Sequence, residues 1–68
     1  MKLISRNLNT HIYPYAVEPD GDIYKSEWDE VIHWCRNNFG DKKWFREFYC
    51  VRFHNEEHLN WFLLRWSS

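Results

Sequence analysis

The last third of the chain constrains the fold most, because it reads as a strand followed by a capped amphipathic helix. Residues 44–53 are rich in the aromatic and branched side chains that favour strands. Asn55 then precedes Glu56 and Glu57, the pattern of a helix N-cap with acidic residues in the first turn. The segment carries more aromatic surface than one small core can bury, and surplus apolar surface usually marks a partner.

Apolar residues at helical spacing predict an earlier helix over residues 27–39. Ser26 is its expected N-cap, and Gly40 is its expected stop in a left-handed conformation. Its apolar face comprises Trp28, Val31, Ile32, Cys35 and Phe39. The stripe of the C-terminal helix comprises Leu59, Phe62, Leu63 and Trp66.

The N-terminal residues predict strands and one turn. Residues 2–6 read as a first short strand, and residues 10–17 are β-prone by composition. Pro14 cannot donate to a ladder, so the second segment is an edge strand or an interrupted one. Residues 19–22 form the clearest turn, and residues 23–24 are expected to return as a short strand.

These elements predict a single α+β domain over residues 1–68. The expected order is β-(β)-α-β-α, a short antiparallel sheet with two amphipathic helices packed on one face. Alternation along residues 44–53 is imperfect, so this run is either one strand covered on both faces or two strands separated by a bend.

Charge and cysteine content limit the function classes. The net charge of −1 and pI near 6.4 argue against a general nucleic-acid binder and against an acidic nucleic-acid mimic. Two cysteines, Cys35 and Cys50, are too few for a disulfide scaffold; one bridge is formally possible, but we expect free thiols. With no signal-like or membrane-spanning apolar run, we expect a cytoplasmic protein.

Surplus aromatic residues predict a protein interface. Trp34 and Trp61 lie off the apolar stripes of their helices, and a domain of this size has one core. Trp, Tyr and Arg dominate binding hot spots. The predicted partner-binding residues are Trp34, Trp61, Arg65, Tyr49 and Arg52. The alternative is that the sheet or the N-terminal segment covers these side chains.

The sequence supports a catalytic or metal site less well than a protein interface. Cys50, His54 and His58, completed by Cys35 or His33, match no established zinc spacing. No residues supply an oxyanion hole or a phosphate loop beside a Cys–His pair. We therefore expect no enzyme activity, no cofactor and no metal.

RNA binding is a further alternative. Residues 46–53 partly match the RNP1 strand of RNA-recognition motifs, through the first basic residue, Phe48, Val51 and Phe53. Glu47, Tyr49 and Cys50 depart from that pattern, and Cys50 replaces an aromatic residue that would stack on a base. We interpret the match as a half-buried strand.

Residues 53–66 resemble the ending of small uncharacterised proteins of tailed bacteriophages. In these, a strand ending in an aromatic residue runs into Asn-Glu-Glu, and a helix closes with Phe-x-Leu-Arg-Trp. Trp34-Cys35 followed by Asn38-Phe39-Gly40 is similar to their central helix ending. The resemblance implies a phage-encoded accessory protein and transfers no chemistry.

The sequence therefore predicts a non-enzymatic module that binds a host or phage protein in the host cytoplasm and modulates or inhibits it. A host enzyme or a defence system is the expected target. The alternative is a self-associating structural or virion component, such as a symmetric homodimer. No membrane contact is expected, and nucleic-acid contact is disfavoured.

Overall fold

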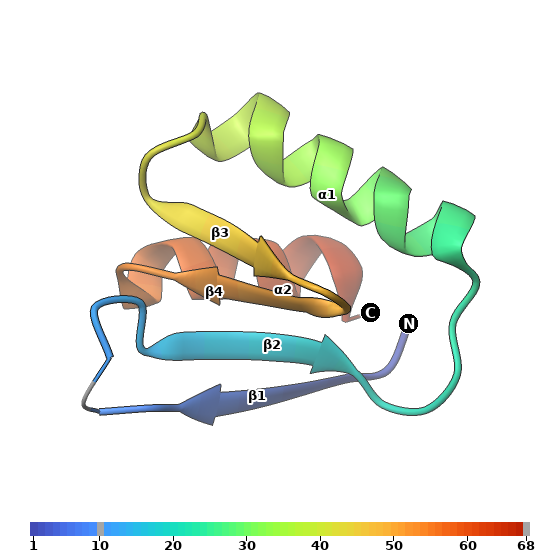
Figure 1. The fold of residues 1–68 in the computed structure, drawn as a ribbon, viewed down its shortest axis with the longest axis horizontal. Helices are drawn as coiled ribbons and strands as arrows, with labels where there is room; N and C mark the ends of the chain where they lie inside the picture. The colour runs from blue at the N-terminus through green and yellow to red at the C-terminus, as the bar shows by residue number, and fades with distance from the viewer. Residues whose placement is uncertain (10, 68) are drawn as a thin grey trace.

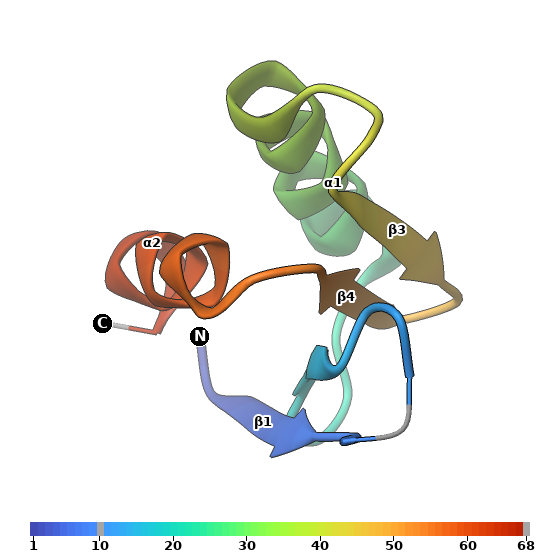
Figure 2. The ribbon, with the colours of Figure 1, turned by 90° about the vertical axis from the view of Figure 1, so that its left-hand side faces the viewer.

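A four-stranded antiparallel sheet, with strand order β1-β2-β4-β3, forms the base of the fold. The computed structural model describes residues 1–9 and 11–67. Figure 1 and Figure 2 show both helices on the same side of the sheet. The elements are β1 (Leu3–Asn7), β2 (Tyr15–Pro19), α1 (Lys25–Phe39), β3 (Trp44–Glu47), β4 (Cys50–Phe53) and α2 (Glu56–Trp66). The predicted α+β class is confirmed, with both helices on one face.

The core lies between the sheet and the helices. α1 contributes four buried side chains, which confirms its predicted apolar face except that Phe39 is half-buried. α2 contributes Phe62, and the rest of its predicted stripe packs half-buried around that ring. The buried apolar side chains of this core are Val17, Trp28, Val31, Ile32, Cys35, Trp44, Val51, Phe53 and Phe62.

Two of the three predicted helix ends follow the local signals of the sequence. Asn55 caps α2, because its side-chain oxygen accepts a 2.8 Å hydrogen bond from the His58 backbone N–H. Gly40 ends α1 at φ 72°, as predicted, and donates its N–H to the Arg36 carbonyl. The predicted cap at Ser26 is wrong: α1 begins at Lys25, after Tyr24, which makes no side-chain capping bond.

The N-terminal strands form a hairpin. β1 lies within one residue of the predicted strand. The second β-prone segment is interrupted at Pro14: the strand begins at Tyr15 and is an interior strand, while Thr10 lies outside the described residues. The predicted strand at residues 23–24 is wrong, because these residues belong to the irregular connection between β2 and α1.

Residues 44–53 fold as two strands separated by a turn. Trp44 pairs with Phe53, and Glu47 pairs with Cys50, so the alternative with a bend is correct. β3 and β4 run antiparallel beside each other, which places the apolar residues Trp44, Val51 and Phe53 on the helix side of the sheet. The fold therefore has one more strand than a single continuous run would give.

Candidate functional site

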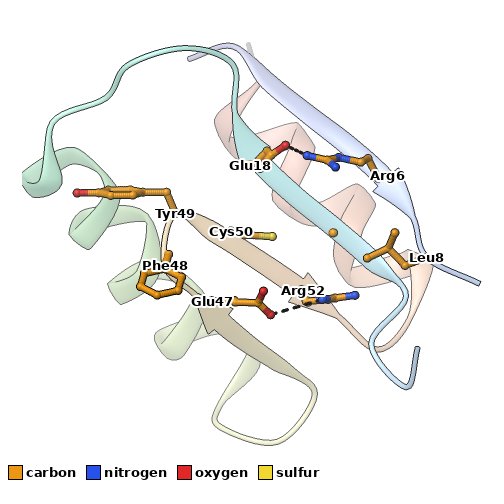
Figure 3. Close-up of a pocket in the computed structure, with 9 residues that line it drawn as sticks. Arg6, Leu8, Glu18, Glu47, Phe48, Tyr49, Cys50 and Arg52 are labelled. Atoms are coloured by element: carbon orange, nitrogen blue, oxygen red, sulfur yellow. Dashed lines mark hydrogen bonds and ion pairs between the residues drawn. The ribbon is translucent and has the colours of Figure 1, made fainter. Parts of the chain in front are cut away.

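The two helices pack on one face of the sheet, and neither helix covers the other face. Side chains alternate along a strand. Val51 and Phe53 are fully buried on the helix side, so Cys50 and Arg52 point to the other side, as Figure 3 shows. We call this side the open face. By strand register it carries Ile4, Arg6, Ala16, Glu18, Phe45, Glu47, Cys50 and Arg52.

A hollow of about 420 Å³ lies on the open face, beside the turn between β3 and β4. Two ion pairs cross it, Arg6 with Glu18 and Arg52 with Glu47 (Figure 3). Each cation therefore faces an anion, and the hollow carries no surplus positive charge for a phosphate. Its lining comprises Arg6, Leu8, Ala16, Glu18, Glu47, Phe48, Tyr49, Cys50 and Arg52.

Arg52 is the most constrained charged residue of the open face, being only 8% exposed. Its Nε donates to the Tyr13 carbonyl at 3.2 Å, and its Nη1 lies 3.5 Å from a Glu47 carboxylate oxygen. The guanidinium carbon lies 5.7 Å from the centre of the Phe45 ring, which in turn packs edge-on against Tyr13. These contacts hold Arg52 rigid beneath the hollow, so it shapes the floor of the hollow.

Phe48 lies in the two-residue turn that connects β3 to β4. Because Glu47 pairs with Cys50, only Phe48 and Tyr49 connect β3 to β4. Phe48 has φ 53°, in the left-handed region that favours glycine, and no other non-glycine residue of the described chain has a positive φ. A side chain costs about 1–2 kcal/mol in this conformation. The Phe48 side chain is nevertheless 87% exposed, so packing within the domain does not offset that cost.

The turn is tied to α1 by charged groups. Arg46 Nε donates to the Phe48 carbonyl at 3.0 Å, and Arg46 Nη1 lies 3.3 Å from Asp29. Lys25 also donates to Asp29, at 2.8 Å. The hydrogen bond from Lys25 is the main cause that lowers the pKa of Asp29, and the charge of Arg46 adds to it. The carboxylate therefore stays ionised and links the turn to the first turns of the helix.

Tyr49 differs from its neighbour Phe48. Its ring lies 6.4 Å from that of the buried Trp28, and the residue is 42% exposed. Tyr49 therefore rests partly on the core, whereas Phe48 projects into solvent. We call Phe48 and Tyr49 together the aromatic tip; it borders the hollow of the open face (Figure 3).

A second aromatic group lies between the two helices, on the other side of the sheet. The centre of the Trp34 ring is 6.3 Å from that of Trp61, 6.1 Å from that of Phe62 and 6.1 Å from that of Trp66, all in edge-to-face arrangements. Phe39 completes this group, which we call the helix seam. Trp34 is half-buried in it, whereas Trp61 is 46% exposed.

The predicted partner-binding residues thus divide between two regions. Tyr49 and Arg52 line the hollow of the open face. Trp34 and Trp61 belong to the helix seam, and Arg65 stacks beside it, with its guanidinium carbon 4.0 Å from the centre of the Trp66 ring. One continuous contact surface does not include all five, because the sheet separates the two groups.

The two cysteines are free thiols on opposite sides of the sheet. Cys35 is buried in the core, and Cys50 lies on the open face. Burial raises the pKa of the Cys35 thiol to about 12. Burial is also the main cause that raises the pKa of Cys50, although the Arg52 charge opposes it. Both groups are therefore held as thiols at neutral pH and not as nucleophilic thiolates.

The candidate zinc ligands do not converge. Among residues 1–9 and 11–67, no group of three His, Cys, Asp or Glu side chains is placed to hold a metal ion. His58 instead stacks on Phe39, with ring centres 4.5 Å apart. His54 is exposed and packs its ring near Tyr13 at 6.0 Å.

The partial RNP1 match does not build a stacking platform. Phe53 is fully buried on the helix side, and Phe48 lies in the turn. The open-face positions of β4 carry Cys50 and Arg52, and neither is the aromatic residue on which a base would stack.

Comparisons with known proteins leave the family of the chain open. No protein-family model, no curated protein and no solved structure matches it. The similarity of residues 53–66 to small bacteriophage proteins therefore stays a prediction. No helix in the described part of the chain has the length and apolar character needed to cross a bilayer.

Phe48 is the site residue that the sequence prediction missed. The run Glu47-Phe48-Tyr49-Cys50 contains none of the Gly, Asn or Asp residues that usually mark a two-residue hairpin turn. The sequence signal for this turn was the imperfect alternation of apolar and polar residues along 44–53. The alternation becomes regular when the chain turns back after Glu47. That pattern indicates a bend but does not identify the residue at its point.

Proposed function

We propose that this chain is a non-enzymatic protein-binding module that contacts its partner through the aromatic tip and the neighbouring hollow of the open face. The observation that carries the proposal is Phe48, an 87% exposed aromatic residue at φ 53°. Glycine would serve the turn better, and the ring contributes little to the packing of the domain. Strained residues of this kind cluster at functional sites. A contact outside the chain explains why an aromatic residue stands there.

The chemistry of the surface favours a protein as the partner. Phe48, Tyr49 and Arg52 are residue types that act as anchors in protein interfaces. The charges of the hollow are paired, which removes the electrostatic attraction on which nucleic-acid binding depends. Phe48 projects from the turn, so its complement is a concave apolar site, of which an enzyme cleft is one kind. A module that occupies such a cleft would inhibit the enzyme.

The biological setting proposed here rests on the similarity of residues 53–66 to bacteriophage proteins. It implies a phage-encoded accessory protein that acts in the cytoplasm of the infected cell. The target is then a host enzyme, a defence protein or another phage protein. The raised pKa values of Cys35 and Cys50 support a non-enzymatic role, because neither thiol is activated.

A capture experiment tests the proposal. The tagged protein is incubated with nuclease-treated bacterial lysate, and bound proteins are identified by mass spectrometry. Three forms are compared: the wild type, Phe48→Gly and Leu64→Lys. Leu64 is the matched control, since it is also a large apolar residue, 82% exposed, but lies on α2 on the other side of the sheet.

We expect one stoichiometric protein with the wild type, full capture with Leu64→Lys, and at least about 30-fold weaker capture with Phe48→Gly, the loss typical of a hot spot. Equal capture by Phe48→Gly and the wild type would remove the aromatic tip from the interface. A wild-type protein that captures nothing would contradict the proposed function as a whole.

A further inference from the structure

The outer side of α2 is a second exposed apolar surface, distinct from the aromatic tip. α2 lies at the edge of the molecule, with one side turned away from both α1 and the sheet (Figure 2). Leu64 is 82% exposed and Trp61 is 46% exposed. Leu64 points away from the buried Phe62, and Trp61, three residues earlier, lies at the border of this side, where its ring also packs against Trp34 and Phe39 of α1.

The charges that flank this side form a self-complementary pattern. Glu57 lies four residues before Trp61, and Arg65 lies four residues after it. The two charges are therefore about 12 Å apart along the helix axis, with Trp61 at their midpoint. Antiparallel packing of two such helices about a two-fold axis at Trp61 places each Glu57 at the level of Arg65 of the other copy.

Both charged groups are available for such a contact. Among the described residues, neither Glu57 nor Arg65 forms an ion pair or a side-chain hydrogen bond, whereas each of the other four arginines forms an ion pair. The Arg65 guanidinium is stacked 4.0 Å from the centre of the Trp66 ring. Stacking fixes the plane of a guanidinium but leaves the N–H groups at its edge free to donate.

We propose that the outer side of α2 binds a second copy of this chain, forming an antiparallel two-fold dimer centred on Trp61. Leu64 and the exposed part of the Trp61 ring, in both copies, form its apolar centre, and two Glu57–Arg65 pairs close its ends. A parallel arrangement would place Glu57 beside Glu57 and Arg65 beside Arg65, so charge selects the antiparallel orientation. This inference does not depend on the proposed function, because the open face stays uncovered in the dimer.

The size of the surface predicts a weak dimer. α2 has 11 residues and is therefore about 16 Å long. Two helices of that length bury less than a standard protein interface, so we expect a Kd on the order of 100 μM. Self-association is then visible only in concentrated solution.

Sedimentation equilibrium of the whole chain, from about 10 μM to 1 mM, tests this dimer. The deciding variant is Glu57→Arg, which turns both expected ion pairs into repulsions and leaves the described contacts of the domain intact. Glu56→Arg is the matched control, because it makes the same charge change one residue earlier, on another side of α2. Circular dichroism confirms that each variant is folded.

We expect Glu57→Arg to weaken the dimer at least about tenfold, and Glu56→Arg to leave it unchanged within about threefold. Combining Glu57→Arg with Arg65→Glu reverses both partners and should restore the wild-type Kd. A wild type that is monomeric at 1 mM overturns the proposal. So does a dimer that weakens equally in Glu57→Arg and Glu56→Arg.

Discussion

The aromatic tip and the helix seam are both built from aromatic residues, but they use them in opposite ways. In the helix seam, Trp34 contacts four other rings and ties α1 to α2. In the aromatic tip, Phe48 is 87% exposed and its backbone is held where glycine is preferred. The contacts around an aromatic residue therefore separate the two cases: Trp34 serves the packing of the domain, whereas Phe48, from which the domain gains little, supports the proposed binding surface.

We expect Trp34→Ala to change the free energy of unfolding most. It tests whether the helix seam stabilises the domain by packing. Removing the ring deletes all its contacts in the helix seam, and we expect a loss of about 3 kcal/mol in the free energy of unfolding. A domain of this size has only about 3–5 kcal/mol in total, so the variant should retain about 0–2 kcal/mol and be partly unfolded at 25 °C. Urea denaturation followed by circular dichroism measures it. A loss below about 0.5 kcal/mol, the range of ordinary surface positions, would show that Trp34 is not a packing residue.

Arg52→Ala tests whether the contacts of Arg52 on the open face stabilise the domain. The change removes a hydrogen bond to the Tyr13 carbonyl and the ion pair with Glu47. Because Arg52 is only 8% exposed, we expect a loss of about 2 kcal/mol in the free energy of unfolding, less than for Trp34→Ala. Lys43→Ala, at an exposed basic residue, is the control and should change it by less than about 0.5 kcal/mol. Equal effects of the two changes would mean that the Arg52 contacts add nothing.

The two cysteines lie on the two sides of the sheet, and their ionisation makes the free energy of unfolding depend on pH. The Cys35 thiol ionises near pH 9 in the unfolded chain and near pH 12 in the folded one. Its burial therefore contributes stability that is fully present below pH 9 and is lost as the pH rises from 9 towards 12. We expect the free energy of unfolding to fall less steeply over this range in Cys35→Ala than in the wild type.

Cys50→Ala serves as the control for that titration. Cys50 is less buried and lies beside Arg52, so its removal should flatten the alkaline decline less than the removal of Cys35. Urea denaturation of the three proteins at a series of pH values measures the slopes. Parallel curves for the wild type and Cys35→Ala would contradict the placement of Cys35 in the core.

Local signals made much of the fold predictable. The periodic apolar face of α1, the stop at Gly40 and the cap at Asn55 all act within one or two helical turns, so they could be read from neighbouring residues. Ser26 failed as a cap because α1 begins two residues earlier than predicted, after Tyr24, whose carbonyl accepts from the N–H groups of Glu27 and Trp28.

The candidate site was less predictable, because it depends on long-range pairing. The strand pairs on either side of Phe48 and Tyr49 force a tight turn without turn residues, so the sequence pattern could not place Phe48 at its point. Arg52 was among the predicted candidates, and the structure places it in the lining of the hollow. Its contact with Tyr13, 39 residues away in sequence, appears only once β2 and β4 lie side by side.

The most direct test of the central claim compares the stability and the partner capture of Phe48→Gly and Phe48→Ala. Both variants remove the ring, but only glycine relieves the left-handed backbone. We predict that Phe48→Gly is more stable than the wild type by about 0.5–1 kcal/mol, that Phe48→Ala is not, and that both lose capture. A Phe48→Gly protein that is less stable than the wild type and captures the same partner equally well would show that Phe48 serves the fold and not a partner.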